Sequence, residues 1–460
     1  MVMKKRAGIV CAVWMAAVLC GCSMFGRTGA GENTEEYTDV PKSQQTVLNW
    51  AVWDREIYPV WDALKEAFEA ENPGVTIEIK DLGSLGYMKV LLNDLLSGED
   101  YDIITTSSVS DYVMLCQKKQ LLPLNYYMAR DKTDLSLYNT DTENLCLDGT
   151  YYQMPFQNEF WMLFYNQDLF DRQRIAYPSN DMTMEDYADL VAQMTSTESS
   201  KRIYGTYYHI WPSVVRAFAL LGEETVPSFT SFAYMEPYYA MISNQEEEES
   251  CQDYIQISTM GTNYAHAFSN GDIAMMPMGS WMIAELVGKQ NQEETSYQKW
   301  NGKNWGIARM PRAAGRDPYE AIGSLRGLAV HASTKNTELA WKFLEFACGE
   351  EGARIQASYG SLPALYNEEI REILTGIEYF PDDESSREVM DVRTILDMDA
   401  ITGYSPDEEE KIRKALPEIH TIWEEYHKKI MSGNQETSEA LLQLEEEVQA
   451  IGNESVEREP

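Results

Sequence analysis

Residues that build metal and redox sites are scarce in this sequence. Its 460 residues include 7 cysteines and 5 histidines. No two cysteines stand in a C-x-x-C spacing, and the histidines at 209, 266, 331, 420 and 427 form no metal-ligand pattern. The motifs G-x-S-x-G, H-E-x-x-H and G-x-x-x-x-G-K-S/T are also missing. The sequence therefore predicts neither a metal site nor a cofactor, and it contains no recognisable catalytic block.

Basic residues are few compared with acidic ones. There are 37 Lys and Arg against 74 Asp and Glu, which gives a formal net charge of -37. Such a surface repels polyanions, so nucleic acid and anionic lipid surfaces are poor partners, whereas neutral or cationic solutes remain open. For most of these acids, solubility is the simpler explanation. Hydrophobic residues make up 44% of the chain, which is enough for the cores of two average domains.

The first residues have the pattern of an export signal. Cations at positions 4–6 precede an apolar stretch from Ile9 to Leu19, which is too short to favour a spanning helix. The following sequence, LCGC at 19–22, resembles the lipobox of bacterial lipoproteins, although a cysteine at position 20 is unusual there. This resemblance implies a signal peptide over 1–21 and lipidation of Cys22, and an uncleaved signal anchor is the alternative. In both cases the rest of the chain is exported.

The state of the remaining thiols stays open at this stage. After processing, four unlipidated cysteines remain, and Cys116 and Cys146 are the nearest pair in sequence. An oxidising environment permits a disulfide between them. Buried free thiols are the alternative.

The chain after residue 45 alternates between strand and helix patterns. Strands are expected at 46–52, 75–79 and 101–106, and helical periodicity follows them at 60–68, 87–96 and 109–118. This alternation predicts a parallel sheet covered by helices on both faces, with a ligand crevice at the carboxyl ends of the strands.

A second unit of the same α/β kind follows. Thr183 and Asp186 form a capping-box pattern at the start of a helix. A C-terminal helical region begins at a predicted N-cap, Ser405, and ends in an amphipathic helix from Leu441 to Ile451. Further strands are expected at 161–166, 203–208, 273–278 and 305–310, and helices at 184–194, at 254–268 and after residue 281.

Several short stretches, in this order along the chain, carry a family resemblance. They are Leu48-Asn49-Trp50, Asn72-Pro73-Gly74-Val75, Tyr101-Asp102-Ile103, Tyr165-Asn166-x-Asp168-Leu169-Phe170, Gly271-Asp272-Ile273-Ala274-Met275-Met276 running into Gly279-Ser280-Trp281, and Gly323-Ser324 with Gly327-Leu328-Ala329-Val330. Together they resemble family 1 of the bacterial extracellular solute-binding proteins, the receptors of ATP-binding-cassette (ABC) importers, most of which carry sugars.

The resemblance implies a periplasmic-binding-protein-like fold of type II, in which two α/β lobes are joined by crossing strands and the ligand lies between them. By position, lobe 1 is expected over 46–155 plus 328–375 and lobe 2 over 156–327 plus 376–452, with crossings near 156–161, 323–327 and 375. Residues 22–45 then form the lipidated cysteine and a flexible tether. Composition alone does not indicate this discontinuous arrangement.

A sugar site needs aromatic rings that stack on the sugar and polar groups that bind its hydroxyls. Trp281 is the strongest candidate for a stacking ring, with Gly279 allowing close approach and Ser280 available as a cap. Arg326 could bind an anionic group of the ligand or pair with an acid of the protein. The other candidates, from loops and crossings expected to face the cleft, are Trp53, Asp54, Ser107, Gln157, Asn158, Trp161, Tyr208, His209, Trp211 and Ser324.

Each candidate also has a structural explanation. Trp53 could be a core residue, Asp54 a helix N-cap and Ser107 or Ser108 a cap, while His209 could be purely structural. Tyr359 and Gly360 are weaker candidates for the rim of the cleft.

The function implied is a non-enzymatic, monomeric lipoprotein that binds a mono- or oligosaccharide outside the cytoplasm and delivers it to the permease subunits of an ABC transporter. A receptor for a polyamine or another non-sugar solute is one alternative. A secreted glycoside hydrolase, which would use two carboxylates, is the other.

Overall fold

A computed structural model describes residues 45–84, 86–138, 142–197, 202–227, 230–290, 304–376, 399–401 and 413–457. They belong to one compact unit that begins at Gln45. The predicted signal peptide, Cys22, the tether up to residue 44 and the predicted N-cap Ser405 lie outside the described residues. In the described part of the chain, no helix combines the length and apolar character needed to cross a membrane.

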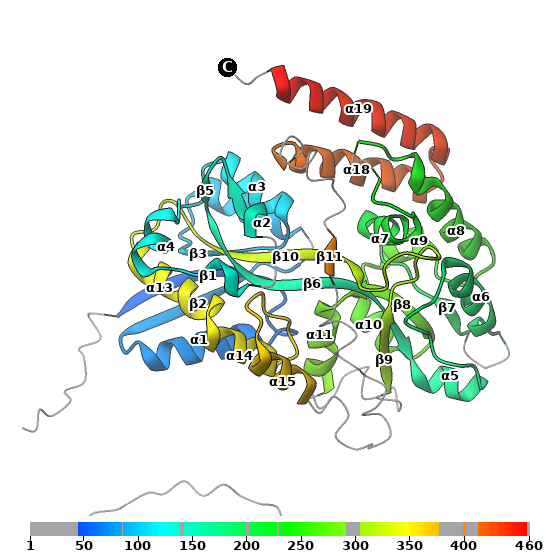
Figure 1. Cartoon of the computed structure of the whole chain (residues 1–460), viewed down its shortest axis with the longest axis horizontal. Helices are drawn as coiled ribbons and strands as arrows, with labels where there is room; N and C mark the ends of the chain where they lie inside the picture. Colours follow the sequence, from blue (N-terminus) through cyan, green and yellow to red (C-terminus); the bar gives the residue numbers. More distant parts are fainter. Residues whose placement is uncertain are drawn as a thin grey trace, which may run out of the picture. The chain divides into compact units, whose positions relative to one another are not determined.

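The centre of this unit is a sheet with strand order β2-β1-β3-β10-β6-β8-β7, in which β9 pairs with β6 and β11 with β10 (Figure 1). The pairs β1–β2, β1–β3 and β7–β8 are parallel, as the alternation predicts. The strands are β1 (Thr46–Val52), β2 (Val75–Asp81), β3 (Ile103–Thr106), β6 (Gln153–Asn166), β7 (Tyr204–Thr206), β8 (Ile273–Gly279), β9 (Trp305–Arg309), β10 (Glu320–Val330) and β11 (Asp399–Ile401), with a separate hairpin of β4 (Cys146–Leu147) and β5 (Thr150–Tyr151).

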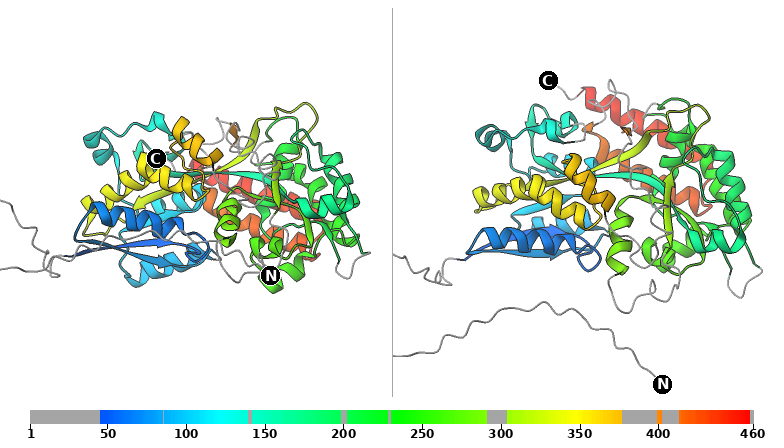
Figure 2. Two further views of the ribbon diagram at one scale, coloured as in Figure 1. Left: turned by 90° about the horizontal axis from the view of Figure 1, so that it is seen from below. Right: turned by 60° about the horizontal axis from the view of Figure 1, so that its bottom comes forward.

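Two long antiparallel strands, β6 and β10, link the two halves of the sheet. The first residues of β6 pair with β10, and its residues 161–166 pair with β8 and β9. At its own end, β10 pairs with β3 over residues 327–330. We call the part around β1, β2 and β3 the first lobe and the part around β7, β8 and β9 the second lobe; both views in Figure 2 show β6 and β10 passing between them.

Helices pack against the sheet in both lobes. The capping box of α6 is confirmed, because Thr183 accepts a hydrogen bond from the Asp186 amide and Asp186 accepts one from the Thr183 amide. The helices are α1 (Val60–Glu71), α2 (Tyr87–Ser97), α3 (Val109–Gln117), α4 (Asn125–Asp131), α5 (Gln167–Gln173), α6 (Met184–Met194), α7 (Pro212–Gly222), α8 (Glu236–Glu247), α9 (Tyr254–Met260), α10 (Tyr264–Ser269), α11 (Trp281–Gln290), α13 (Thr337–Cys348), α14 (Glu350–Ser358), α15 (Glu368–Gly376), α18 (Leu416–Met431) and α19 (Thr437–Glu457).

One helix prediction is wrong. The continuous helix expected over 254–268 is two helices, α9 and α10. Gly261 has φ of +60°, in the left-handed region that ends α9, and the Asn263 side chain accepts a hydrogen bond from the His266 amide to begin α10. Left-handed glycine is a common helix terminator, so the break has a local cause.

Three large buried cores and one small cluster, of Leu145, Leu325 and Ala364, lie within the described residues. One lies in the first lobe and contains Trp50, Trp61 and Trp341, while another lies in the second lobe and includes Trp423 of α18. Assigning Trp61, Trp341 and Trp423 to packing is therefore confirmed. The third core combines residues of α14 and α15 with residues of β8, β9 and α11, so it crosses the expected lobe boundary near residue 375. The boundaries themselves stay a prediction.

The four cysteines of the described region are free thiols. Cys116 and Cys146 are half-buried, and burial raises the pKa of the Cys116 thiol to about 12. The structure thus has free thiols in place of a bridge between them.

Candidate ligand-binding site

The junction of the lobes contains a buried arginine between two tryptophans. Arg326 lies in β10, where the pairing with β6 shifts register just after it, and its guanidinium carbon is 5.1 Å from the ring centroid of Trp53 and 5.6 Å from that of Trp281. Trp53 directly follows β1 of the first lobe, and Trp281 begins α11 of the second. The sheet thus brings three predicted site residues from distant parts of the sequence together.

Carboxylate and amide groups fix this guanidinium. Arg326 Nη1 is 3.0 Å from Glu159 Oε1 and donates to Gln157 Oε1 at 3.3 Å. The Ser280 hydroxyl donates to Glu159 at 2.7 Å and accepts from the Phe160 amide. Burial raises the pKa of the Glu159 carboxyl, while the positive charge of Arg326 acts in the opposite direction. Of the two roles considered for Arg326, the structure shows pairing with an acid of the protein.

A second carboxylate lies beside the first. Glu285 of α11 accepts a hydrogen bond from the Tyr58 hydroxyl at 2.8 Å and another from the Tyr264 hydroxyl. Burial, and after it the charge of Glu285, raises the pKa of both tyrosines well above the usual 10, so their hydroxyls stay protonated and can donate. Because Tyr58 belongs to the core of the first lobe, its bond to Glu285 joins the lobes.

The position of Trp281 depends on its glycine neighbour. A Cβ atom at Gly279 would lie 1.9 Å from the Trp281 ring, so only glycine leaves room for this ring. Trp161 packs edge-on against Trp281 at a centroid distance of 5.7 Å, and Trp211 lies 6.2 Å from it. The close approach expected at Gly279 is thus made by the side chain of Trp281 itself.

His209 extends this aromatic group. Its ring lies 4.3 Å from that of Trp211 and 5.5 Å from that of Tyr264. Burial lowers the pKa of His209 to about 4. The imidazole is therefore neutral near pH 7, and it can offer one donor and one acceptor.

Three other predicted residues make their side-chain hydrogen bonds outside this cluster. The Asp54 carboxylate accepts from the Ser84 amide, the Ser107 hydroxyl donates to Asp111, and the Tyr208 hydroxyl donates to Gln245 in the core of the second lobe. On the crossing strands, Ser324 is paired with Glu159 of the cluster, and Asn158 is paired with Leu325.

The contacts decide two of the structural explanations given for these candidates. Ser108 is the N-cap of α3, so a cap at this point is confirmed, whereas α1 begins after Pro59 and not after Asp54. A Cβ atom at Gly360 would lie 3.6 Å from Ile283 of α11, and Tyr359 is exposed.

Sequence reasoning missed Tyr58, Glu159, Tyr264 and Glu285. Two of them carried a usable signal, because Glu159 adjoins the predicted pair at 157–158 and Glu285 lies four residues after Trp281, on the same helix face. Nothing in the local pattern marks Tyr58 or Tyr264.

The cluster combines flat aromatic faces, two carboxylates, an amide and several hydroxyls, which are the groups that bind a polar, ring-shaped solute. Neither carboxylate stands free beside an open face, since one pairs with Arg326 and the other accepts from tyrosines. A shallow surface hollow on the second lobe, lined by Tyr177, Met182 and Asp186 among others, shares no residue with this cluster.

The model of one protein family, described as bacterial extracellular solute-binding protein, matches residues 54–354. The chain belongs to this family. Membership associates this solute-binding protein with an extracytoplasmic location and with ligand binding as its family's activity. The resemblance inferred from the short stretches is confirmed.

Two relatives of this solute-binding protein are also named as binding proteins. A binding protein of Brucella abortus is 24% identical over 363 residues, covering 76% of this chain and 81% of the relative. The maltodextrin-binding protein MdxE of Bacillus subtilis is 21% identical over 373 residues, covering 76% and 78%.

Solved structures share its fold. A sugar transporter of Rhizobium etli, in an open conformation, has a TM-score of 0.66 and 28% identity over 88% of this chain and 99% of its own. An ABC substrate-binding protein of Listeria monocytogenes, in complex with cycloalternan, has a TM-score of 0.71 and 19% identity over 88% and 98%. The two-lobed α/β fold expected for this solute-binding protein is confirmed.

Proposed function

We propose that this protein is the substrate-binding lipoprotein of an ABC importer and that it binds a mono- or oligosaccharide between its lobes. The observation that carries the proposal is the group of aromatic rings and carboxylates at the junction of the lobes. Trp53 and Trp281 would stack on the sugar, while Gln157 would bind its hydroxyls. Trp161, Trp211, His209, Gly279 and Ser280 would support Trp281 and the polar groups.

The choice of a sugar is supported by the relatives. One is named as a maltodextrin-binding protein, one as a sugar transporter, and one was crystallised with cycloalternan. The remaining predicted contacts, from Asp54, Ser107, Asn158, Tyr208 and Ser324, stay predictions and would require these side chains to reorient or the ligand to extend beyond the cluster.

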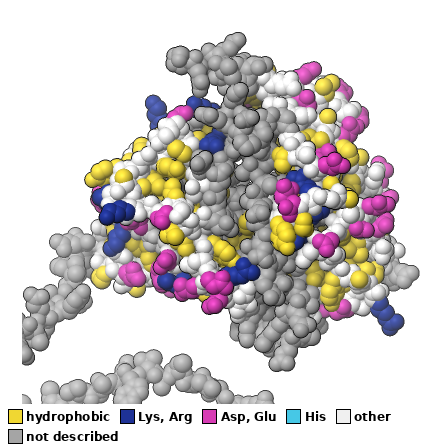
Figure 3. Space-filling model, in the orientation of Figure 1, with side chains coloured by type: hydrophobic (Ala, Val, Ile, Leu, Met, Phe, Trp, Pro, Cys, Tyr) yellow, Lys and Arg dark blue, Asp and Glu magenta, His cyan; other side chains and the backbone are white. Residues whose placement is uncertain are grey.

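The proposal also includes transfer of the sugar to the permease and the location of the protein at the membrane. After closing on the sugar, the protein would dock as a monomer on two permease subunits, and a lipid on Cys22 would keep it at the outer face of the membrane. Acidic side chains lie on both lobes in Figure 3, which agrees with a neutral or cationic solute and with the absence of nucleic acid among its partners.

A non-sugar, cationic solute is the second candidate. The cluster already holds one cation, the Arg326 guanidinium, against two tryptophans and a carboxylate. A polyamine would find similar groups there. A glycoside hydrolase is the third candidate, with Glu159 and Glu285 of the cluster as its two carboxylates.

Isothermal calorimetry of the purified protein against neutral, acidic and amino sugars and spermidine separates these candidates. We expect saturable binding of a sugar without product. Release of reducing ends would support the hydrolase instead, and binding of spermidine alone would support the polyamine receptor.

A single variant tests the site. Trp281→Ala should weaken sugar binding by at least about tenfold, because a half-buried stacking ring is lost. Tyr319→Ala is the matched control, since Tyr319 is an exposed ring of the second lobe that also packs on an arginine, Arg309, at 4.6 Å. Equal affinity of both variants would remove Trp281 from the site.

A further inference from the structure

The faces of Trp53 and Trp281 that suit ligand stacking are in contact with a cation of the protein itself. The Arg326 guanidinium lies within 5.6 Å of both ring centroids, and the three side chains come from the first lobe, the second lobe and a crossing strand. A guanidinium on an indole face is attracted to the ring quadrupole, more strongly where water is excluded. Trp53 and Arg326 are both buried, so this contact is of the stronger kind.

A carboxylate of the protein holds the Arg326 guanidinium between the two rings. Glu159 pairs with it at 3.0 Å, and Ser280 of the second lobe donates to the same carboxylate group. The ion pair is almost fully removed from water, with side-chain exposures of 10% for Arg326 and 5% for Glu159. Separating such a pair leaves a buried charge without a partner, which is strongly unfavourable. Arg326 therefore has a well-defined resting position between the two rings.

A second contact joins the same two lobes beside it. The Tyr58 hydroxyl, in the core of the first lobe, donates to Glu285 of α11 across 227 residues of sequence. Ala284, the neighbour of Glu285, packs into the core of the first lobe. These contacts join protein groups of the two lobes, so they hold the lobes together.

We propose that Arg326 is a built-in competitor of the ligand: it occupies the space between Trp53 and Trp281, and with the Tyr58–Glu285 bond it holds the lobes closed until a ligand displaces it. This inference rests on the proposed function only in that the ligand enters the cleft between these rings. Affinity for a solute is then reduced by the fraction of molecules closed on Arg326.

Closure without ligand is tested by neutron scattering from the full chain in contrast-matched detergent, with no solute added. The double variant Glu159→Gln/Arg326→Met removes both charges together, so neither is left unpaired. Tyr58→Phe removes the other contact and keeps the ring. We expect each to have a larger radius of gyration than the wild type.

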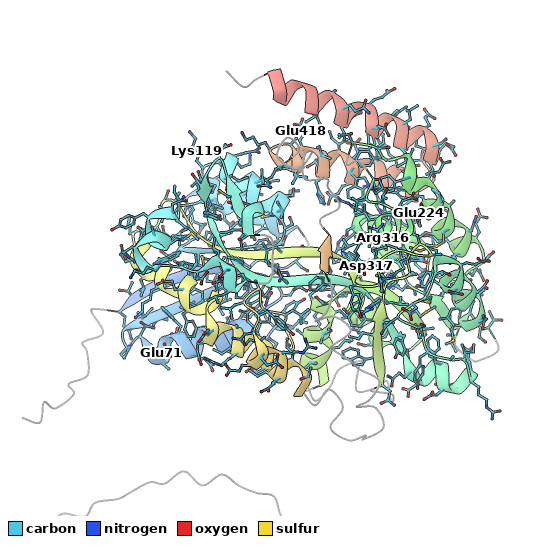
Figure 4. The ribbon with its side chains drawn as sticks, viewed as in Figure 1. Glu71, Lys119, Glu224, Arg316, Asp317 and Glu418 are labelled. Atoms are coloured by element: carbon cyan, nitrogen blue, oxygen red, sulfur yellow. The ribbon has the colours of Figure 1, made fainter. Side chains whose placement is uncertain are left out.

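Two controls remove equivalent groups inside a single lobe. Arg316→Met/Glu320→Gln deletes an ion pair of 2.6 Å in the second lobe, where Figure 4 labels Arg316. Tyr87→Phe deletes a buried hydroxyl that bonds the Thr105 carbonyl within the first lobe. Neither control should change the radius. If the double variant and Tyr58→Phe both scatter as the wild type does, the proposed closure is wrong.

Affinity tests the competition itself. For the sugar selected by calorimetry, the double variant should bind roughly tenfold more tightly, as expected if about a tenth of wild-type molecules are open. Weaker binding by this variant would make Arg326 a ligand contact and overturn the competitor role. If no sugar binds any form, the proposed function fails, whereas the scattering result still decides whether Arg326 closes the lobes.

Discussion

A single buried histidine links the stability of this protein to pH. In His427 of α18, Nδ1 lies 3.0 Å from the Tyr239 hydroxyl and Nε2 lies 3.1 Å from the Ile210 carbonyl oxygen. Burial lowers the pKa of this imidazole from 6.5 to about 4. Between these two pH values the unfolded chain binds the proton and the folded chain does not, so stability is complete above pH 6.5 and falls as the pH is lowered.

We expect His427 alone to remove about 3 kcal/mol from the free energy of unfolding between pH 7 and pH 4. Urea unfolding at several pH values measures this loss, and His427→Gln should make the pH dependence shallower by that amount. Equal pH dependence in the wild type and His427→Gln would contradict the prediction.

At the residue scale, the sequence predicted three residues of the site but not the residues that surround them. Trp53, Trp281 and Arg326 were predicted because each follows or lies in an expected strand near the cleft, and the structure brings them together. Their partners Glu159, Glu285 and Tyr58 depend on contacts between segments more than 100 residues apart, which local patterns do not contain. Tyr208, by contrast, was predicted from its aromatic neighbours, but its hydroxyl is bonded within the core of the second lobe.

Among the elements, the turn between α9 and α10 depends on the left-handed conformation of Gly261. A Cβ atom there would meet no atom within 4 Å, so a substitution changes only the backbone energy. Gly261→Ala should lower the free energy of unfolding by about 1 kcal/mol, because L-residues with side chains disfavour positive φ. Urea unfolding measures this.

Asparagine tolerates the left-handed region better than alanine does, so Gly261→Asn should cost less than Gly261→Ala. The prediction depends on which of the two variants has the lower free energy of unfolding. If alanine were no worse than asparagine, the two segments would join into the single helix that periodicity suggested.

The positions of helices and strands could be predicted where the local sequence patterns agree. The strands β1 and β8 and the helices α2, α3 and α6 begin at the expected residues, because alternation, helical periodicity and caps all agree there. The crossing strand β6 was expected from Trp161 but begins at Gln153. Its polar stretch Gln157-Asn158-Glu159 interrupts the apolar run, although these side chains are buried, and Gln157 and Glu159 are bonded to Arg326 of β10.

For the molecule as a whole, periodicity indicated two α/β units but not their connection. A strand such as β10, which follows the second unit in sequence and pairs with β3 of the first, cannot be recognised from local patterns. That arrangement was expected only from the resemblance to solute-binding proteins. The family comparison and the fold confirm the resemblance, while the exact boundary between lobes depends on a core shared by both.

The proposed location at the membrane also concerns the whole molecule. It depends on one atom, the sulfur of Cys22, which would carry the lipid. If this cysteine is lipidated, the protein expressed in a bacterium should enter the detergent phase on Triton X-114 partitioning, because a diacyl anchor supplies far more apolar surface than the acidic folded part can offset. Cys22→Ser should move it to the aqueous phase while leaving calorimetric sugar affinity unchanged, since the proposed site lies in the unit that begins at Gln45. Cys20→Ser is the matched control and should stay in the detergent phase. If Cys22→Ser stays there too, the chain is held by an uncleaved signal anchor, and the lipoprotein assignment is wrong.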